Sequence, residues 1–156
     1  MFLMNSEMYK RYSKKTMSNV VLSGSLRALI DKGFVREDNC LFLKECFEIQ
    51  TNASRDNFID DTGCECFFNS VNIDDYEEDM LLEKGLMFAQ EVFNKFSEQS
   101  SSEILNCVMS MDEFGLKVKF HLVRTGEQWL SDDLEKYEEA ILVADSSEIL
   151  LKLPVA

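Results

Sequence analysis

The sequence predicts an α+β fold, in which an antiparallel β-sheet of about four or more strands carries helices packed on one face. Two observations lead to this prediction. Residues 104–111 and 116–123 have the pattern of two strands joined by the turn DEFG. Residues 75–97 carry apolar side chains at helical spacing, so a long amphipathic helix can cover an apolar sheet face.

The second strand of this hairpin shows a clear alternation. Its apolar positions are Leu116, Val118, Phe120 and Leu122, and its polar positions are Lys117, Lys119 and His121. Because successive side chains of a strand point to opposite faces, one face packs on the core and the other meets water or a partner. The pattern therefore places His121 on the polar face.

The long helix is expected to begin at an acidic segment, with Asp74 or Asp75 as N-cap and acidic residues in the first turn, where the helix dipole favours them. Its expected end lies near Ser97, about twenty residues after Asp75. The apolar stripe consists of Tyr76, Met80, Leu86, Met87, Val92, Phe93 and Phe96. An earlier helix is expected from Ser18 onward, ended by Gly33 in a left-handed C-cap.

The remaining elements follow from local composition. Residues 65–73, ECFFNSVNI, favour a strand, and so does the apolar run at residues 140–144. Residues 34–62 are expected to hold a short helix or strand followed by a loop. Residues 146–156 are expected to form a short helix or an edge strand.

The chain of 156 residues is expected to form one domain over residues 18–156, preceded at residues 1–17 by a basic N-terminal arm or a frayed helix. With 46% hydrophobic residues, it can bury a core without disulfides or metal. It holds no apolar run of the ~20 residues that a membrane span needs, and its N-terminus does not have the pattern of a signal peptide. A cytoplasmic protein that does not bind membranes is therefore predicted.

The formal net charge is −13, from 16 basic and 29 acidic side chains. Residues 1–36 carry an excess of basic side chains, so the rest of the chain is still more acidic. A surface of this sign repels the phosphate backbone of nucleic acid and speeds encounter with basic proteins. The sequence therefore predicts a basic protein as the partner, and no nucleic acid, with simple solubility as the alternative explanation.

Five cysteines, an odd number, indicate free buried thiols in a cytoplasmic chain. Zinc binding is the alternative, but Cys64 and Cys66 flank only Glu65, and the single histidine, His121, lies far along the chain. In the expected strand both cysteines point to one face beside Phe68, which suits core packing. No metal or other cofactor is therefore predicted.

No catalytic residue is predicted either. Acid–base catalysis most often uses histidine, and His121 has no cysteine, serine or aspartate partner by motif. A cysteine nucleophile activated by His121 stays open as an alternative, because neighbours in space need not be neighbours in sequence. The chain also lacks glycine-rich phosphate loops, the HExxH motif and the EF-hand loop. A binding protein is thus favoured over an enzyme.

Two acidic clusters are the candidate partner-binding sites. Their carboxylates can pair with Arg and Lys of a basic protein, and aromatic side chains beside them can anchor an interface. The candidates are Asp74, Asp75, Tyr76, Glu77, Glu78 and Asp79 in the first cluster, and Trp129, Asp132, Asp133, Glu135, Tyr137 and Glu138 in the second. The alternatives without a binding function are a helix start for the first cluster, a solvated turn for the second, and a core position for Trp129.

Residues 117–146, KVKFHLVRTGEQWLSDDLEKYEEAILVADS, resemble small bacterial immunity proteins of polymorphic toxin systems, including those of contact-dependent growth inhibition. The shared pattern is a strand with a histidine, a basic residue, Gly-Glu-x-Trp-Leu, an acidic loop and a closing strand. The resemblance implies a protein that binds one cognate toxin domain, commonly a basic nuclease, and blocks its active site or its access to substrate. No functional residue carries over, because contacts differ between toxin–immunity pairs.

Two other interpretations stay open at this point. The chain can be an acidic regulatory module that binds another basic protein or pairs with itself, or a Cys/His-dependent enzyme. Gene order separates the first of these from an immunity protein, because an immunity protein is encoded directly downstream of its toxin. Substitution of His121 tests the second.

Overall fold

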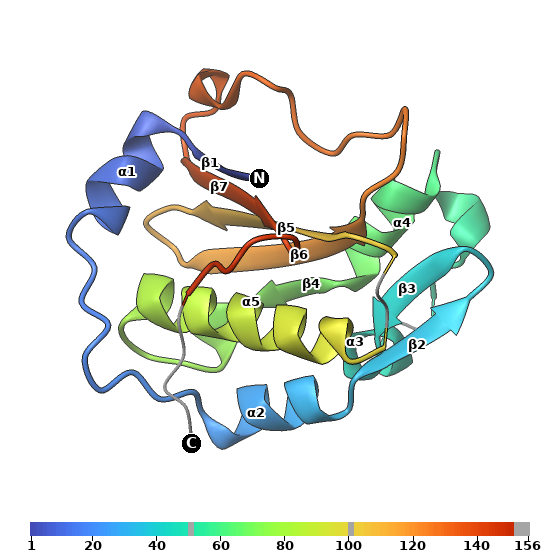
Figure 1. Ribbon diagram of the computed structural model, residues 1–156, viewed down its shortest axis with the longest axis horizontal. Helices are drawn as coiled ribbons and strands as arrows, with labels where there is room; N and C mark the ends of the chain where they lie inside the picture. Colours follow the sequence, from blue (N-terminus) through green and yellow to red (C-terminus); the bar gives the residue numbers. More distant parts are fainter. Residues whose placement is uncertain (50–51, 100–101, 152–156) are drawn as a thin grey trace.

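The computed structural model describes residues 1–49, 52–99 and 102–151. Over these ranges the chain forms a five-stranded antiparallel sheet in the order β1-β7-β5-β6-β4 and a separate antiparallel pair, β2–β3 (Figure 1). The strands are β1 (Phe2–Met4), β2 (Phe34–Glu37), β3 (Cys40–Leu43), β4 (Ser70–Asn72), β5 (Leu105–Met111), β6 (Leu116–Leu122) and β7 (Ala140–Asp145). The predicted α+β fold is confirmed.

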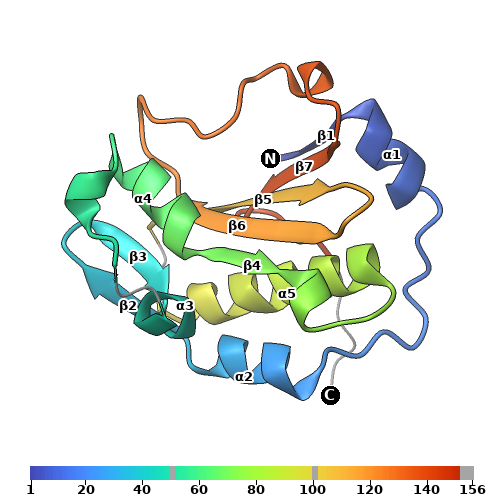
Figure 2. The same cartoon turned by 180° about the vertical axis from the view of Figure 1, so that it is seen from behind.

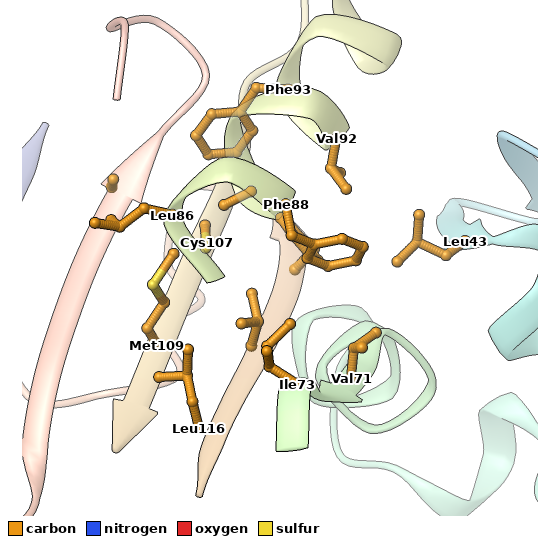
Figure 3. Packing of buried hydrophobic residues seen from close by; sticks show 14 of the residues in the cluster. Leu43, Val71, Ile73, Leu86, Phe88, Val92, Phe93, Cys107, Met109 and Leu116 are labelled. Carbon is orange, nitrogen blue, oxygen red and sulfur yellow. The ribbon is translucent and has the colours of Figure 1, made fainter. Parts of the chain in front are cut away.

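The helices α2 (Gly24–Asp31) and α5 (Leu81–Ser97) form layers on one face of the main sheet (Figures 1 and 2). α5 lies on β5 and β6, and α2 packs on α5. The rings of Phe88 and Phe93 in α5 lie 5.9 and 6.2 Å from that of Phe120 in β6. Figure 3 shows how side chains of α5 meet those of the sheet in this core. The other helices are α1 (Ser6–Tyr12), α3 (Lys44–Ile49) and α4 (Asp61–Phe68).

The opposite face of the main sheet, here called the outer face, is partly covered by loop 123–139, which joins β6 to β7 (Figure 1). An apolar cluster lies between this loop and the sheet. It consists of Val108, Leu134, Ile141 and Val143, with Leu130 and Tyr137 packed against it. The loop is therefore held down by buried apolar contacts on a face that no long helix covers among the described residues.

Several predicted elements are confirmed. The hairpin of β5 and β6 pairs in register from Leu105↔Leu122 to Met111↔Leu116. β7 occupies the predicted strand at residues 140–144 and lies between β1 and β5. α2 is followed as expected by Gly33, whose φ of 73° is left-handed, although the helix begins later than expected, after Ser23 as N-cap.

The N-terminal region differs from the predicted arm or frayed helix. β1 pairs with β7 from Phe2↔Ala144 to Met4↔Leu142, and Met8 of α1 is fully buried. Asn5 ties the two elements together, since its side chain accepts hydrogen bonds from the N–H groups of Met8 and Ile141. Lys10, Arg11 and Lys14 are exposed, as a basic arm would have them, and a strand of three residues is too short to stand out in the sequence.

The strand predicted at residues 65–73 is wrong over most of its length. Residues 61–68 form α4, and only residues 70–72 are a strand. Asp60 caps α4, because its carboxylate accepts a hydrogen bond from the N–H of Gly63 at 2.7 Å. Both Cys64 and Cys66 are buried on this helix, so packing overrides the β-propensity of the aromatic residues beside them.

The predicted start of the long helix is also wrong. Residues 73–75 form a short 3₁₀ turn, and α5 begins only at Leu81, after Met80 in a left-handed conformation with φ 53°. The acidic residues from 74 to 79 therefore lie before the helix and not in its first turn. The end at Ser97 is confirmed.

The sequence left alternatives open for residues 34–62 and 146–156, and the structure decides between them in part. Residues 34–49 hold β2, β3 and α3, and residues 55–57 form a 3₁₀ turn. Residues 146–151 contain neither a helix nor a strand. The rest of the predicted C-terminal element, residues 152–156, lies outside the described residues.

The carboxylate of Glu65 in α4 is fully buried and connects the two sheets. Its Oε2 accepts a hydrogen bond from the N–H of Leu41 in β3, at 2.7 Å. Its Oε1 accepts from the N–H of Leu122 in β6, at 2.9 Å, and from Nη1 of Arg124, at 2.6 Å. One side chain thus satisfies two backbone donors and one cation, which are the partners that a buried carboxylate requires.

Asn69, directly after α4, makes a second bridge between the same strands. Its Oδ1 accepts from the N–H of Leu43 at 2.7 Å. Its Nδ2 donates to the carbonyls of Leu41 and Phe120, at 2.9 and 3.1 Å. Because β3 and β6 belong to different sheets, these two side chains supply hydrogen bonds that a strand ladder would otherwise provide.

Glu65→Ala is expected to lower the free energy of unfolding by about 3–5 kcal/mol, because it leaves Arg124 and two backbone donors without their acceptor. Glu7→Ala is the matched control, since Glu7 forms an exposed ion pair with Lys10 on α1, and such pairs contribute less than about 1 kcal/mol. Urea unfolding followed by circular dichroism measures both. Equal losses in the two variants would contradict the structural role of Glu65.

Candidate functional site

A pocket of about 560 Å³ lies between loop 123–139 and the outer face of the main sheet. Its apolar wall is formed by Leu3, Val108, Trp129, Leu130, Leu134 and Val143. Its polar wall includes Asn106, His121, Arg124, Glu127, Asp132 and Asp145. Pockets that mix apolar walls with a few polar groups are the usual binding sites of proteins, so this pocket is the candidate functional site.

Three polar side chains form a row across the floor of the pocket. In the sheet register, Asn106 of β5 pairs with His121 of β6 on one side and with Asp145 of β7 on the other. All three lie on the outer face and are buried. The predicted polar face of the hairpin is thus confirmed for His121, but loop 123–139 shields it from water.

The hydrogen bonds of His121 fix its protonation. Its Nδ1 lies 2.9 Å from the carbonyl of Leu122, which can only accept, so Nδ1 carries the proton. Its Nε2 lies 3.0 Å from Nδ2 of Asn106 and therefore accepts. Burial lowers the pKa of His121 below its ordinary value, in agreement with a neutral imidazole. Both ring nitrogens are engaged within the protein.

Asn106 is left with an unused acceptor. Its Nδ2 donates to His121, and its Oδ1 is buried without a hydrogen-bond partner among the described residues. An unsatisfied buried acceptor costs about 1–3 kcal/mol. Groups of this kind are rare in folded proteins and mark places where a donor from outside can bind.

The two cations that line the pocket are already bound by the protein itself. Nη1 of Arg124 donates to Glu65, and Nη2 donates to the carbonyl of Asn39 at 3.1 Å. The amino group of Met1 lies 3.1 Å from Asp145 and 3.2 Å from Glu148. Neither cation therefore offers an unpaired positive charge to an occupant of the pocket.

All five cysteines are free and buried, unlike the partly exposed, low-pKa thiols of activated nucleophiles. Burial raises the pKa values of Cys46 and Cys66 to about 12 and also raises that of Cys107. Among the residues that the structure describes, no group of three or more His, Cys, Asp or Glu side chains is arranged to hold a metal ion. The groups at the pocket are suited to binding by shape, charge and hydrogen bonds.

The first predicted acidic cluster is mostly used within the fold. Asp74 accepts from the N–H of Leu116 at 3.0 Å, and Glu77 accepts from that of Ser23 at 2.7 Å. Lys84 pairs with Glu77 at 3.2 Å and with Asp79 at 2.8 Å.

The other members of the first cluster divide into two kinds. Tyr76 is half-buried against the main core. Asp75 and Glu78 are exposed and have no hydrogen bond or ion pair within the described ranges. Only these two carboxylates of the cluster are thus available to a partner.

The second predicted cluster lies on loop 123–139, beside the pocket. Trp129 is 42% exposed, and Nζ of Lys119 lies 5.3 Å from its ring centroid. Asp132 is exposed and accepts from Nε2 of Gln128 at 3.1 Å, and Glu138 is exposed without a partner in the described chain.

Three further members of the second cluster stabilise the loop. Asp133 is exposed and accepts from the N–H of Glu135, which itself binds Ser6 of α1. The hydroxyl of half-buried Tyr137 accepts from the N–H of Ser131 at 3.0 Å. The structure thus brings Trp129 and Asp132 to the pocket, where both are lining residues, and gives these three a structural role.

Asn106, Arg124 and Asp145 belong to the pocket but not to the predicted sites. One signal was present for Asn106, because it is a polar residue inside the apolar strand sequence LNCVMSM. Arg124 and Asp145 each directly follow a predicted strand, and although Arg124 is the basic residue of the pattern shared with immunity proteins, that pattern assigns it no contact. The hydrogen bond to Glu65 places Arg124 at the pocket, and strand pairing with Asn106 places Asp145 there. Sequence spacing shows neither contact.

The sequence of the chain matches the model of the Uncharacterized protein PM0498 family over residues 3–153. The chain belongs to this family. No curated protein and no solved structure matches it. In the described part of the chain, no helix combines the length and apolar character that a membrane crossing requires.

His121 is expected to titrate below the ordinary histidine pKa of 6.5, because burial disfavours its charged form. The stability that neutral His121 contributes is then fully present above pH 6.5 and is lost as the pH falls toward the pKa of the folded state. NMR of the imidazole protons measures this pKa without ambiguity, since the chain has one histidine. His121→Gln is expected to remove that part of the pH dependence of urea unfolding. A ring that titrates at or above 6.5 would contradict the assigned neutral state.

Proposed function

We propose that the chain is an immunity protein, which acts without catalysis by binding and neutralising a cognate toxin domain. The partner is a basic protein, of which a nuclease is the expected kind, and the interaction takes place in the cytoplasm of the producing cell. The observation that carries this proposal is the surface of loop 123–139. There, half-exposed Trp129 and the exposed carboxylate of Asp132 line a pocket, and Glu138 is exposed further along the same loop.

Charge supports a basic partner. Loop 123–139 contains six carboxylates against Arg124 and Lys136, and Arg124 is already paired with Glu65. A strongly negative surface attracts a positively charged protein over a distance and orients it during encounter. A nuclease needs a basic surface to hold nucleic acid, so an acidic loop can occupy that surface.

The loop is favoured over the first acidic cluster because it combines exposed carboxylates with an exposed aromatic side chain, whereas Tyr76 of the first cluster packs against the main core. Asp74, Glu77 and Asp79 bind backbone amides or Lys84, so a partner would compete with contacts of the fold. Asp132 and Glu138 are exposed, and Trp129 provides an aromatic anchor between acidic positions. Loop 123–139 is therefore the proposed interface.

Two tests address the function itself. Expression of the product of the gene directly upstream is expected to inhibit growth, and co-expression of this chain is expected to restore it. The two proteins are expected to copurify, with binding that weakens as salt increases. Copurification with some other basic protein, without protection from a toxin, would instead support a regulatory module.

Asp132→Lys with Glu138→Lys is expected to slow association with the toxin at least about tenfold and to reduce its salt dependence, because both charges lie on the proposed interface. Asp75→Lys with Glu78→Lys is the matched control, since it changes the net charge equally at exposed positions outside that interface. Surface plasmon resonance at low and high salt measures both rates.

Circular dichroism of both double variants checks that the fold is unchanged. A larger effect of the control pair would move the interface to the first acidic cluster. An equal effect of both pairs would mean that only the total charge of the chain matters.

A further inference from the structure

Several hydrogen-bond acceptors that line the pocket under loop 123–139 can accept a further donor. Oδ1 of Asn106 has no donor within the described chain. Asp132 and Glu127 line the pocket as carboxylates, and the donors bound to them are the neutral groups Nε2 of Gln128 and the N–H of Thr62. An occupant that donates several hydrogen bonds therefore fits this wall.

The charge of the pocket has the sign that a cation requires. The positive groups at its wall, Arg124 and the amino group of Met1, are held by Glu65, Asp145 and Glu148. Glu127 and Asp132 have no ion pair with a cation in the described residues. Among the lining residues, Glu127, Asp132 and Asp145 outnumber Arg124 and the amino group of Met1, so the lining is negative, while Nζ of Lys119 lies next to it at the Trp129 ring.

The walls suit a flat cation on a long apolar stem. Val108, Val143 and Leu134 provide an apolar surface against which methylene groups can pack. Trp129 provides an aromatic ring, and Lys119 already lies 5.3 Å from its centroid in a cation–π contact. This ring thus accepts a cation in the chain alone, and an incoming guanidinium takes the place of the Lys119 ammonium there.

We propose that this pocket binds an arginine side chain of the basic partner. The stem packs on the apolar wall, the guanidinium stacks against Trp129, and its N–H groups donate to Asp132, to Glu127 and, after a small rotation of the amide, to Oδ1 of Asn106. Guanidinium provides five donors in one plane and is more weakly hydrated than ammonium, so it meets several acceptors where lysine cannot. This inference rests on the proposed function and specifies how the partner is recognised.

A small probe tests the pocket without the partner. The probe is Nα-acetyl-arginine amide, and its uncharged control is Nα-acetyl-citrulline amide, which has nearly the same shape. Trp129 is the single tryptophan of the chain, so its fluorescence reports on the pocket directly. Saturable binding of the arginine probe in the millimolar range is expected, at least about tenfold tighter than that of the citrulline probe.

Variants connect binding to the proposed contacts. Asp132→Asn is expected to weaken binding of the arginine probe about threefold, and Asp75→Asn, which removes the same charge at a distant exposed site, is expected to leave it unchanged. Asn106→Leu, which removes the unfilled acceptor but no charge, is expected to weaken binding of the arginine probe while a preference over citrulline remains, with ¹⁵N–¹H spectra as the check on folding. If Asn106→Leu does not fold, the Asp132 and Asp75 pair still decides the matter.

The inference is overturned if the arginine probe produces no saturable change, if citrulline binds equally well, or if Asp75→Asn has the same effect as Asp132→Asn. These outcomes leave the proposed function standing, provided that the chain still protects against its toxin. Conversely, arginine binding without any toxin partner would support the pocket and contradict the immunity function. The two claims therefore fail separately.

Discussion

The rest of the structure depends on the buried carboxylate of Glu65. Three parts of the chain meet at this group: β3 through Leu41, β6 through Leu122, and the start of loop 123–139 through Arg124. A buried carboxylate is tolerated only where hydrogen-bond donors reach its oxygens. The three parts of the chain that supply these donors must therefore come together in one arrangement. The same contact that joins the small sheet to the main sheet therefore also fixes where the loop leaves the sheet.

The other end of the loop is fixed by the N-terminal region. Nδ2 of Asn5 donates to the carbonyls of Leu134 and Glu139, at 3.2 and 2.8 Å, and Glu135 binds Ser6. With both ends held and Leu134 buried on the sheet, the loop presents Trp129 and Asp132 in a set position. A surface that is ordered before binding loses less conformational entropy on association, which favours a tight and specific partner.

Strong local patterns predicted the hairpin, β7 and the end of α5 correctly, because burial on one face imposes a period that the sequence displays. α4 was missed because its aromatic residues favour strands locally, whereas Phe68 packs in the folded chain on Phe42 and Phe47. The row of Asp145, Asn106 and His121 depends on pairing between strands distant in sequence, and no motif records it. The acidic clusters were found, but only hydrogen bonds separate structural carboxylates from available ones.

The central claim is that loop 123–139 over the outer face is the surface that binds a basic partner. Hydrogen–deuterium exchange of the chain, alone and with its copurified toxin, tests this claim most directly. Slower exchange is predicted on binding for backbone amides of residues 123–139, with little change at residues 73–80. Protection at residues 73–80 with none in the loop would contradict the account.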